Sequence, residues 1–166
     1  MRVGFGYDVH AFATGRKLIL GGIELSAEQG LQGHSDADVL THAVMDALLG
    51  AAALGDIGLL FPDNDQRYQD VSSIVLLEEV VAILKTRGYT CSNVDCTVVA
   101  QAPKVAPYRE EIRKKLAAAL EIEIEQVSVK ATTTEGLGFT GRKEGIAAYA
   151  CCLIRGGGFI HGRSTC

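Results

Sequence analysis

Gly6-Tyr7-Asp8-Val9-His10 lies within a run, residues 2–10, whose composition is typical of a β-strand. Successive side chains of a strand point to opposite faces, so Asp8 and His10 are expected on the same face. A carboxylate and an imidazole side by side are a partial ligand set for a metal ion. A third ligand would have to come from elsewhere in the chain.

His42 is the third candidate ligand. It belongs to residues 38–54, whose apolar side chains recur with the period of an α-helix. Asp38 and Asp46 lie one turn before and after His42, so either carboxylate could accept a hydrogen bond from its second ring nitrogen. One carboxylate with two imidazoles is a set that a catalytic zinc uses when it keeps one coordination position open. The spacing alone equally allows an ion pair of Asp8 beside two ordinary polar histidines.

The composition indicates an ordinary globular protein. The chain has 166 residues, 48% of them apolar and 22% charged, which is enough for one domain with a sizeable core. Its net charge of -4 argues against nucleic-acid binding by bulk electrostatics. The five cysteines form no C-x-x-C pair, and no apolar run is long enough for a membrane span or a signal peptide. We therefore expect a cytoplasmic protein without nucleic-acid or membrane partners.

The order of the predicted elements indicates an α+β fold. We expect a single domain, residues 1–155, in which helices pack on one face of a mixed β-sheet, and a flexible tail at residues 156–166. Gly21-Gly22 is a hairpin turn, and Ser35 or Asp36 is the expected cap of the first helix. Strands are predicted at residues 2–10, 17–20, 23–25, 89–101, 126–134 and 145–155, helices at 38–54, 70–87 and 108–120, loops at 29–33 and 56–65, and a tight connection at 137–141.

Several connecting segments carry side chains that suit phosphate chemistry. His34 has no capping role and could donate to a phosphate, and the acidic loop of residues 56–65 offers oxygen ligands for Mg²⁺. Lys104 and Arg142 are cations in loops, and Thr132-Thr133-Thr134 ends a strand with three hydroxyls. Each of these segments also has an ordinary structural interpretation as a turn, a cap or a strand end.

Motifs of other enzyme classes are missing from the sequence. It contains no P-loop, no G-x-G-x-x-G after a strand and no G-x-S-x-G elbow, and no cysteine lies in a nucleophile motif. The sequence therefore indicates neither a P-loop nor a dinucleotide-binding fold, and it shows no motif of a protein nucleophile.

Taken together, the motifs resemble those of the 2-C-methyl-D-erythritol 2,4-cyclodiphosphate synthase family over residues 1–155. The matching segments are Gly6-Tyr7-Asp8-Val9-His10, Gly33-His34-Ser35-Asp36-Ala37-Asp38, Ala51-Ala52-Ala53-Leu54-Gly55-Asp56-Ile57-Gly58, Phe61-Pro62-Asp63-Asn64-Asp65, Ala100-Gln101-Ala102-Pro103-Lys104, Lys130-Ala131-Thr132-Thr133-Thr134-Glu135 and residues 137–145. The resemblance implies a phosphorus–oxygen lyase of the non-mevalonate isoprenoid pathway. Its substrate would be 4-diphosphocytidyl-2-C-methyl-D-erythritol 2-phosphate, whose 2-phosphate attacks the β-phosphorus and expels CMP.

The resemblance also implies the assembly, the metals and the catalytic residues. The family forms homotrimers with active sites between neighbouring subunits. Asp8, His10 and His42 would hold Zn²⁺, with a substrate phosphate oxygen as fourth ligand, while Mg²⁺ or Mn²⁺ bridges substrate phosphates. His34 and Thr133 would stabilise the transition state.

Two sets of substrate contacts follow from the same resemblance. The methylerythritol phosphate portion would meet Ser35, Asp56, Ile57, Gly58, Phe61, Pro62, Asp63, Asn64 and Asp65. The cytidine diphosphate portion would meet Ala100, Gln101, Ala102, Pro103, Lys104, Val105, Ala106, Thr132, Thr133, Thr134 and Glu135. Further substrate contacts would be made by Asp8, Val9, His10, His34, Phe139 and Arg142.

The sequence departs from the family at two positions. Gly136 replaces a longer side chain, and Tyr149 stands where a carboxylate near Arg142 often faces the trimer axis. In the family this axis can hold an isoprenoid diphosphate, and Tyr7 with Tyr149 would change the polarity of that channel. Two other functions suit the same residues: a zinc phosphoesterase that uses metal-bound water, and a non-enzymatic trimer that binds nucleotide or isoprenoid around a structural metal.

Overall fold

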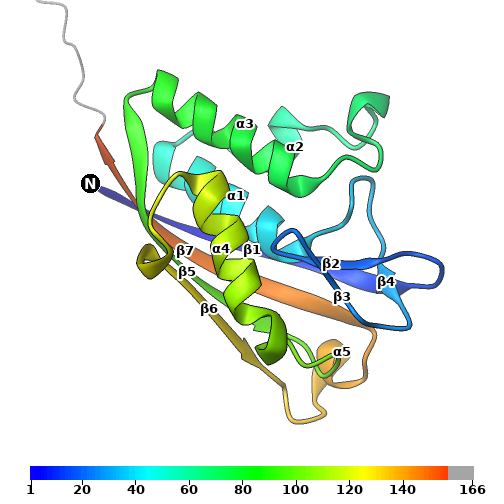
Figure 1. The fold of residues 1–166 in the computed structure, drawn as a ribbon. Coiled ribbons are helices and arrows are strands. Elements are labelled where there is room, and N and C mark those ends of the chain that lie inside the picture. Colours follow the sequence, from blue (N-terminus) through cyan, green and yellow to red (C-terminus); the bar gives the residue numbers. More distant parts are fainter. Residues whose placement is uncertain (157–166) are drawn as a thin grey trace, which may run out of the picture.

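A five-stranded mixed sheet forms the centre of the computed structural model, which describes residues 1–156 (Figure 1). Its strands lie in the order β4-β1-β7-β5-β6. Neighbouring strands are antiparallel except β5 and β6, which run parallel. The strands are β1 (Arg2–Ala13), β4 (Gly30–Leu31), β5 (Tyr89–Val99), β6 (Val127–Thr132) and β7 (Gly145–Gly156). The predicted α+β class with a mixed sheet is confirmed.

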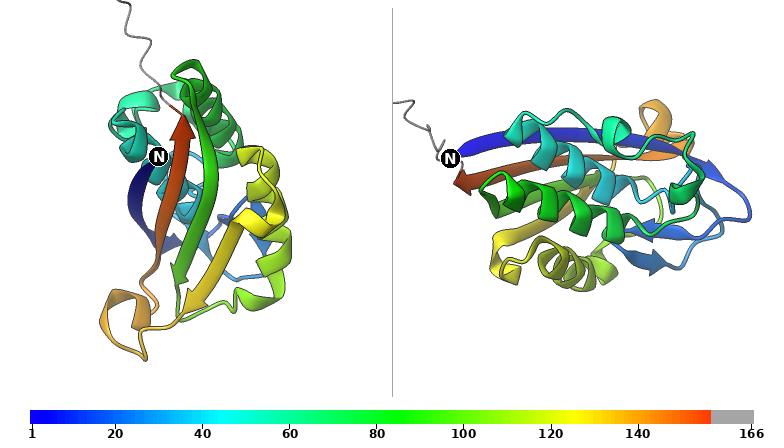
Figure 2. Two further views of the ribbon diagram at one scale, coloured as in Figure 1. Left: turned by 90° about the vertical axis from the view of Figure 1, so that its left-hand side faces the viewer. Right: turned by 90° about the horizontal axis from the view of Figure 1, so that it is seen from above.

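Three long helices pack on one face of this sheet (Figures 1 and 2). They are α1 (Val39–Ala52), α3 (Ser73–Thr86) and α4 (Arg109–Leu120). Their apolar faces and the helix-facing side chains of the sheet join in one buried hydrophobic cluster. Shorter helical segments are α2 (Ile57–Leu60), α5 (Gly138–Gly141), η1 (Gln66–Tyr68), η2 (Ala106–Tyr108) and η3 (Ile124–Gln126).

Two glycines let α1 lie directly on β1. A Cβ atom added to Gly4 would be 1.8 Å from the carbonyl oxygen of Ala47, and one added to Gly6 would be 2.0 Å from that of Ala43. Real Cβ atoms do not approach a carbonyl oxygen so closely, so the absence of side chains at both positions permits the close approach. The first turn of α1 therefore sits against the second half of β1.

The N-terminus of α1 differs from the prediction. Its N-cap is Asp38, whose carboxylate accepts the backbone N–H of Thr41, so the expected caps Ser35 and Asp36 are wrong. Asp38 also accepts the backbone N–H groups of Gly21 and Gly22, at 2.9 and 2.6 Å. These bonds fasten the helix to the turn between β2 (Leu18–Leu20) and β3 (Ile23–Leu25). The predicted Gly21-Gly22 hairpin is confirmed, with φ of +57° and +73° at the two glycines.

Other boundaries and connecting segments also differ from the predictions. The second helix begins at Ser73 instead of residue 70, and the predicted loop 29–33 contains β4, which pairs with the end of β1. Residues 56–65 contain α2, and the connection at 137–141 contains α5. Both are single helical turns too short to show an apolar period. Of the tail predicted for residues 156–166, Gly156 ends β7 and the remaining positions lie outside the described residues.

The sheet face opposite the helices is exposed, and its part on β1 and β7 is apolar, while β5 and β6 carry the ion pair of Asp95 with Lys130. Val3 and Phe5 are 69% and 64% exposed, and Tyr7, Val9 and Tyr149 are exposed on the same face. The rings of Tyr7 and Tyr149 lie 4.9 Å apart across the β1–β7 pair. No helix of the described residues covers this face (Figure 2).

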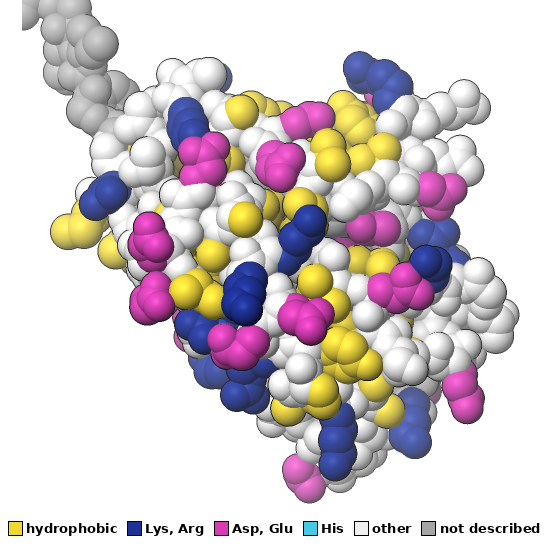
Figure 3. Space-filling model, viewed as in Figure 1, with side chains coloured by type: hydrophobic (Ala, Val, Ile, Leu, Met, Phe, Trp, Pro, Cys, Tyr) yellow, Lys and Arg dark blue, Asp and Glu magenta, His cyan; other side chains and the backbone are white. Residues whose placement is uncertain are grey.

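The helix-covered side has a different surface. Acidic and basic side chains alternate over it without separating into regions of one sign (Figure 3). Among residues 1–156, no helix is long and apolar enough to cross a membrane.

Candidate metal centre and substrate cavities

Asp8, His10 and His42 meet where β1 passes the first turn of α1. Asp8 and His10 leave β1 on the same side as Gly4 and Gly6, which is the side that α1 covers. Oδ2 of Asp8 lies 2.9 Å from Nε2 of His10 and 3.0 Å from Nδ1 of His42. The two ring nitrogens are 3.2 Å apart. The structure thus confirms that these three predicted ligands come together.

The donor atoms of this cluster fit a zinc ion. Nδ1 of His10 lies 2.5 Å from the carbonyl oxygen of Gln32, which can only accept, so Nδ1 carries the hydrogen and Nε2 presents a lone pair. Zinc–nitrogen bonds of about 2.0–2.1 Å at tetrahedral angles place ligand atoms roughly 3.3 Å apart. The separations of 2.9–3.2 Å between the three atoms are close to that spacing. All three ligands therefore suit one ion.

The ionisation of Asp8 and His10 also favours a cation at this point. Burial alone would raise the pKa of Asp8, but hydrogen bonds from His10 and His42 hold that pKa well below its usual range. Burial acts to lower the pKa of His10, and its hydrogen bond with Asp8 outweighs this and raises that pKa. Asp8 is therefore a carboxylate at neutral pH, and a proton competes with a metal for Nε2 of His10.

The second ring nitrogen of His42 has partners that the sequence did not indicate. Nε2 lies 2.9 Å from Oγ of Ser73 and 3.2 Å from Oγ of Ser35. The expectation that Asp38 or Asp46 would be this partner is wrong. Asp38 caps the helix and faces the β2–β3 turn, and Asp46 accepts the backbone N–H of Ile57 at 2.9 Å.

The metal cluster lies in the wall of a cavity of about 220 Å³. His34 lines the same cavity, where its Nε2 donates to the carbonyl oxygen of Asp65 at 2.9 Å. The predicted site residues in this cavity are Asp8, His10, His34, Ser35, His42, Ile57, Gly58, Phe61 and Asp63. Sequence reasoning missed Gly33, Met45, Tyr68 and Leu76, which complete the lining and carry no chemical signature.

Two carboxylates of the acidic loop have structural partners. Asp56 caps α2 through the backbone N–H of Leu59, and Asp65 caps η1 and pairs with Arg67. Hydrogen bonds from Arg67 lower the pKa of Asp65. Asp63, in contrast, faces the cavity.

A second cavity, of about 390 Å³, opens at the carboxyl ends of the parallel strands β5 and β6. Thr133 lines this cavity, so it does not share the metal cavity with His34. Its hydroxyl donates to the carboxylate of Glu135 at 2.7 Å. The predicted residues found here are Ala100, Gln101, Pro103, Lys104, Val105, Ala106, Thr132, Thr133 and Glu135.

Nine predicted contact residues line neither cavity. Several of these side chains instead form hydrogen bonds or ion pairs with other residues of the same chain. Arg142, for example, forms an ion pair with Glu144. The nine are Val9, Asp56, Pro62, Asn64, Asp65, Ala102, Thr134, Phe139 and Arg142.

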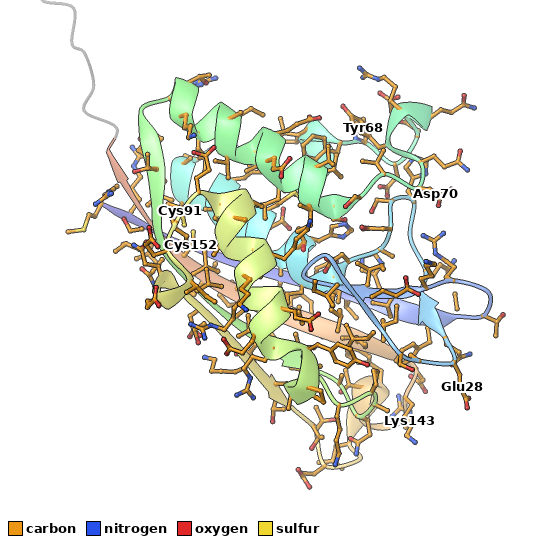
Figure 4. All side chains as sticks on the ribbon, viewed as in Figure 1. Glu28, Tyr68, Asp70, Cys91, Lys143 and Cys152 are labelled. Atoms are coloured by element: carbon orange, nitrogen blue, oxygen red, sulfur yellow. The ribbon has the colours of Figure 1, made fainter. Side chains whose placement is uncertain are left out.

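The cysteines at positions 91, 96, 151 and 152 line neither of these cavities. The four within the described residues are free, and Cys91 and Cys152 are buried on β5 and β7, where β7 pairs with the first residues of β1 (Figure 4). Burial raises the pKa of Cys91 to about 11 and that of Cys152 to about 12. Neither is a thiolate at neutral pH, which agrees with a reaction that needs no cysteine nucleophile.

Comparison with known proteins identifies the family. The model of the YgbB family matches residues 1–155. The chain belongs to the YgbB family. The 2-C-methyl-D-erythritol 2,4-cyclodiphosphate synthase of Syntrophomonas wolfei is 62% identical over 154 residues, 93% of this chain and 98% of that protein. The synthase of Clostridium acetobutylicum is 56% identical over 154 residues, 93% of this chain and 99% of its own. The predicted family membership is confirmed.

Solved structures agree with this assignment. The Plasmodium falciparum IspF–CDP complex has a TM-score of 0.82 and 35% identity, with 93% of this chain and 96% of that chain covered. The bifunctional IspDF of Campylobacter jejuni has a TM-score of 0.89 and 41% identity, and the match covers 92% of this chain and 42% of that longer one.

Proposed function

We propose that the chain converts 4-diphosphocytidyl-2-C-methyl-D-erythritol 2-phosphate to 2-C-methyl-D-erythritol 2,4-cyclodiphosphate and CMP. The observation that carries the proposal is the convergence of Asp8, His10 and His42 beside His34, in a chain 62% identical to a named synthase. The relatives support the predicted activity of a lyase in isoprenoid biosynthesis. The reaction is an intramolecular attack of the 2-phosphate on the β-phosphorus, with CMP as leaving group.

A divalent metal is part of the proposal. Zinc bound by Asp8, His10 and His42 would neutralise phosphate charge and leave its fourth position for a phosphate oxygen, and Mg²⁺ or Mn²⁺ would bridge the other phosphates. Three protein ligands come together in the part of the chain that the structure describes. This number supports a site with an open coordination position rather than a structural site, which would have four protein ligands.

The other residues bind and orient the substrate. Phosphoryl transfer requires alignment of the attacking and leaving oxygens and stabilisation of charge, and it requires no protein nucleophile. His34, whose ring is held at the wall of the metal cavity by the carbonyl oxygen of Asp65, would stabilise the charge of the transition state from there. Thr133 and Lys104 line the second cavity, where a hydroxyl and an ammonium suit the diphosphate of the cytidine portion.

We also infer that the chain works as a homotrimer whose active sites lie between subunits. The proposed catalytic residues His34 and Thr133 line different cavities of one chain, so a substrate that meets both is better placed between two copies. The exposed apolar face formed by Val3, Phe5 and Tyr149 is a surface that other subunits would cover.

One assay tests the function. The purified chain is incubated with the named substrate, and ³¹P NMR follows the products with and without a chelator. We expect CMP and a cyclic diphosphate in equal amounts, and loss of both when the metal is removed. Hydrolysis to an open-chain bisphosphate or to inorganic phosphate in place of the cyclic diphosphate would contradict the proposal and favour the phosphoesterase. Turnover that does not respond to chelator would contradict it in favour of a metal-independent enzyme.

A further inference from the structure

A chain of hydrogen bonds runs from the half-buried Asp36 through the buried Ser73 to the buried His42. Oγ of Ser73 lies 2.5 Å from Oδ1 of Asp36 and 2.9 Å from Nε2 of His42. Ser73 is fully buried and His42 is 8% exposed, so water does not compete freely for these bonds. The three residues come from the loop before α1, from α1 itself and from the first position of α3.

The direction of these bonds follows from their donors. The two oxygens of Asp36 accept backbone N–H groups, Oδ1 that of Asp38 at 3.2 Å and Oδ2 that of Ser73 at 3.0 Å. Asp36 therefore acts as an acceptor at both oxygens, and the short bond from Ser73 must use the one hydroxyl hydrogen that Ser73 has. Oγ of Ser73 consequently presents a lone pair to His42, and Nε2 of His42 has to carry a hydrogen.

We propose that Ser73 and Asp36 are positioning residues, which hold His42 in the tautomer that presents the bare Nδ1 to the metal. The arrangement parallels His10, whose Nδ1–H is bound by the Gln32 carbonyl so that Nε2 faces the cluster. Ser35 does not fix the tautomer of His42 in this way, because its hydroxyl hydrogen is not donated to a carboxylate. Its Oγ is also farther from Nε2 of His42, at 3.2 Å. The inference rests on the metal site of the proposed function and concerns residues that make no contact with the metal themselves.

The first test measures metal affinity directly, without turnover. Removal of such partners of a metal-binding histidine typically lowers affinity by about 10–100-fold, so Ser73→Ala is expected to weaken Zn²⁺ binding by that factor in a competition titration with a chelator. Ser72→Ala is the matched control, because Ser72 is the neighbouring serine, is exposed and makes no side-chain capping bond. It should bind zinc like the unaltered chain. Equal zinc affinity in Ser73→Ala and the unaltered chain would overturn the proposal.

The second test reads the tautomer and needs no variant. In the zinc-loaded chain, long-range ¹H–¹⁵N spectra should show a hydrogen on Nε2 of His42 while its Nδ1 is bare and bound to the metal. A bare Nε2 of His42 in the zinc-loaded, unaltered chain would overturn the proposal even if Ser73→Ala does not fold. The two proposals can fail separately. If the unaltered chain releases no CMP but Ser73→Ala still weakens zinc binding, the proposed activity is contradicted and this inference holds.

Discussion

Oδ2 of Asp8 lies 3.0 Å from Nδ1 of His42, although the two residues are separated by 34 positions in the sequence. The contact exists because α1 lies against the glycine backbone of β1, and it brings a carboxylate and two imidazoles to one point.

Replacement of His42 by alanine is expected to abolish zinc binding and turnover while the chain stays folded. Two ligands remain after the change, which is too few to hold zinc at its usual affinity. Zinc content measured by mass spectrometry should fall from stoichiometric to background, with an unchanged circular dichroism spectrum. Asp46→Asn is the control, because Asp46 bonds to Ile57 and lies outside the cluster, so this variant should retain zinc. Stoichiometric zinc in His42→Ala would refute the ligand assignment.

Replacement of Gly6 by alanine is expected to destabilise the chain and to disturb the metal centre together. The new Cβ would meet the Ala43 carbonyl at 2.0 Å, so helix and strand must separate, at a cost of about 3 kcal/mol or more in the free energy of unfolding. Urea unfolding and zinc titration measure the two effects.

The control for Gly6 is a glycine in α1 itself. A Cβ on Gly50 would meet nothing within 4 Å, so Gly50→Ala should stabilise the chain by roughly 0.5–1 kcal/mol through helix propensity. Equal stability of the Gly6 and Gly50 variants would show that the contact between β1 and α1 is looser than described.

The pair of Asp8 and His10 predicts opposite pH responses for the metal-free and zinc-loaded chains. The lowered pKa of Asp8 contributes stability above its unfolded value of 3.8, and this is lost as pH falls through the folded pKa. The raised pKa of His10 contributes stability that is fully present below 6.5 and is lost as pH rises through the folded pKa. The pair therefore stabilises the metal-free chain most between these two values.

Zinc binding should show the reverse dependence on acid. Protons compete with zinc for Nε2 of His10, so zinc affinity should fall as pH drops through the raised pKa of His10. Unfolding of the metal-free chain and its His10→Gln variant, together with zinc titrations from pH 5 to 8.5, would measure both responses. Zinc affinity that is constant over this range would contradict the assignment of His10 as a ligand.

Lys104→Ala is expected to raise KM more than it lowers kcat. Lys104 lines the second cavity, where its ammonium would bind the diphosphate of the leaving nucleotide in both the ground state and the transition state. Steady-state kinetics of CMP release measures the two constants. Lys114→Ala, a change of an exposed lysine on α4 outside the cavity, should leave both unchanged. A fall in kcat at constant KM would place Lys104 in the chemical step.

Active sites between subunits predict complementation of two inactive variants. His42→Ala lacks the metal and Thr133→Val lacks the hydroxyl of the other cavity, so each alone should be inactive. If the subunits are unfolded and refolded as an equal mixture, about a quarter of the sites between subunits would pair an intact His42 with an intact Thr133. Activity should recover to that fraction. No recovery, in mixtures shown to contain both chains in one assembly, would indicate sites within single chains.

The period of the strand made much of the metal centre predictable. Asp8 and His10 were placed on one face by alternation alone, and the helical period placed His42 on the first turns of α1. The sheet class followed from the order of the elements in the same way. These features depend on local spacing, which the sequence displays directly.

The supporting contacts were not predictable, because they depend on tertiary placement. Ser73 reaches His42 over 31 positions, and no local pattern distinguishes it from Ser72. Asp38 was expected to face His42, but its role as N-cap turns its carboxylate toward the β2–β3 turn. The predicted residues that bind substrate likewise divide between two cavities only once the sheet is assembled.

Gly4, Gly6, Asp8 and His10 occupy every second position of β1. If one residue were inserted or deleted in the first half of this strand, every side chain on one side of that point would move to the opposite face of the sheet. Bulky side chains would then meet α1, and the ligands would point to the sheet face that carries Val3 and Phe5. Evolution can therefore vary the identity of residues along β1 more easily than its length, because a shift of register removes the packing and the chemistry in one event.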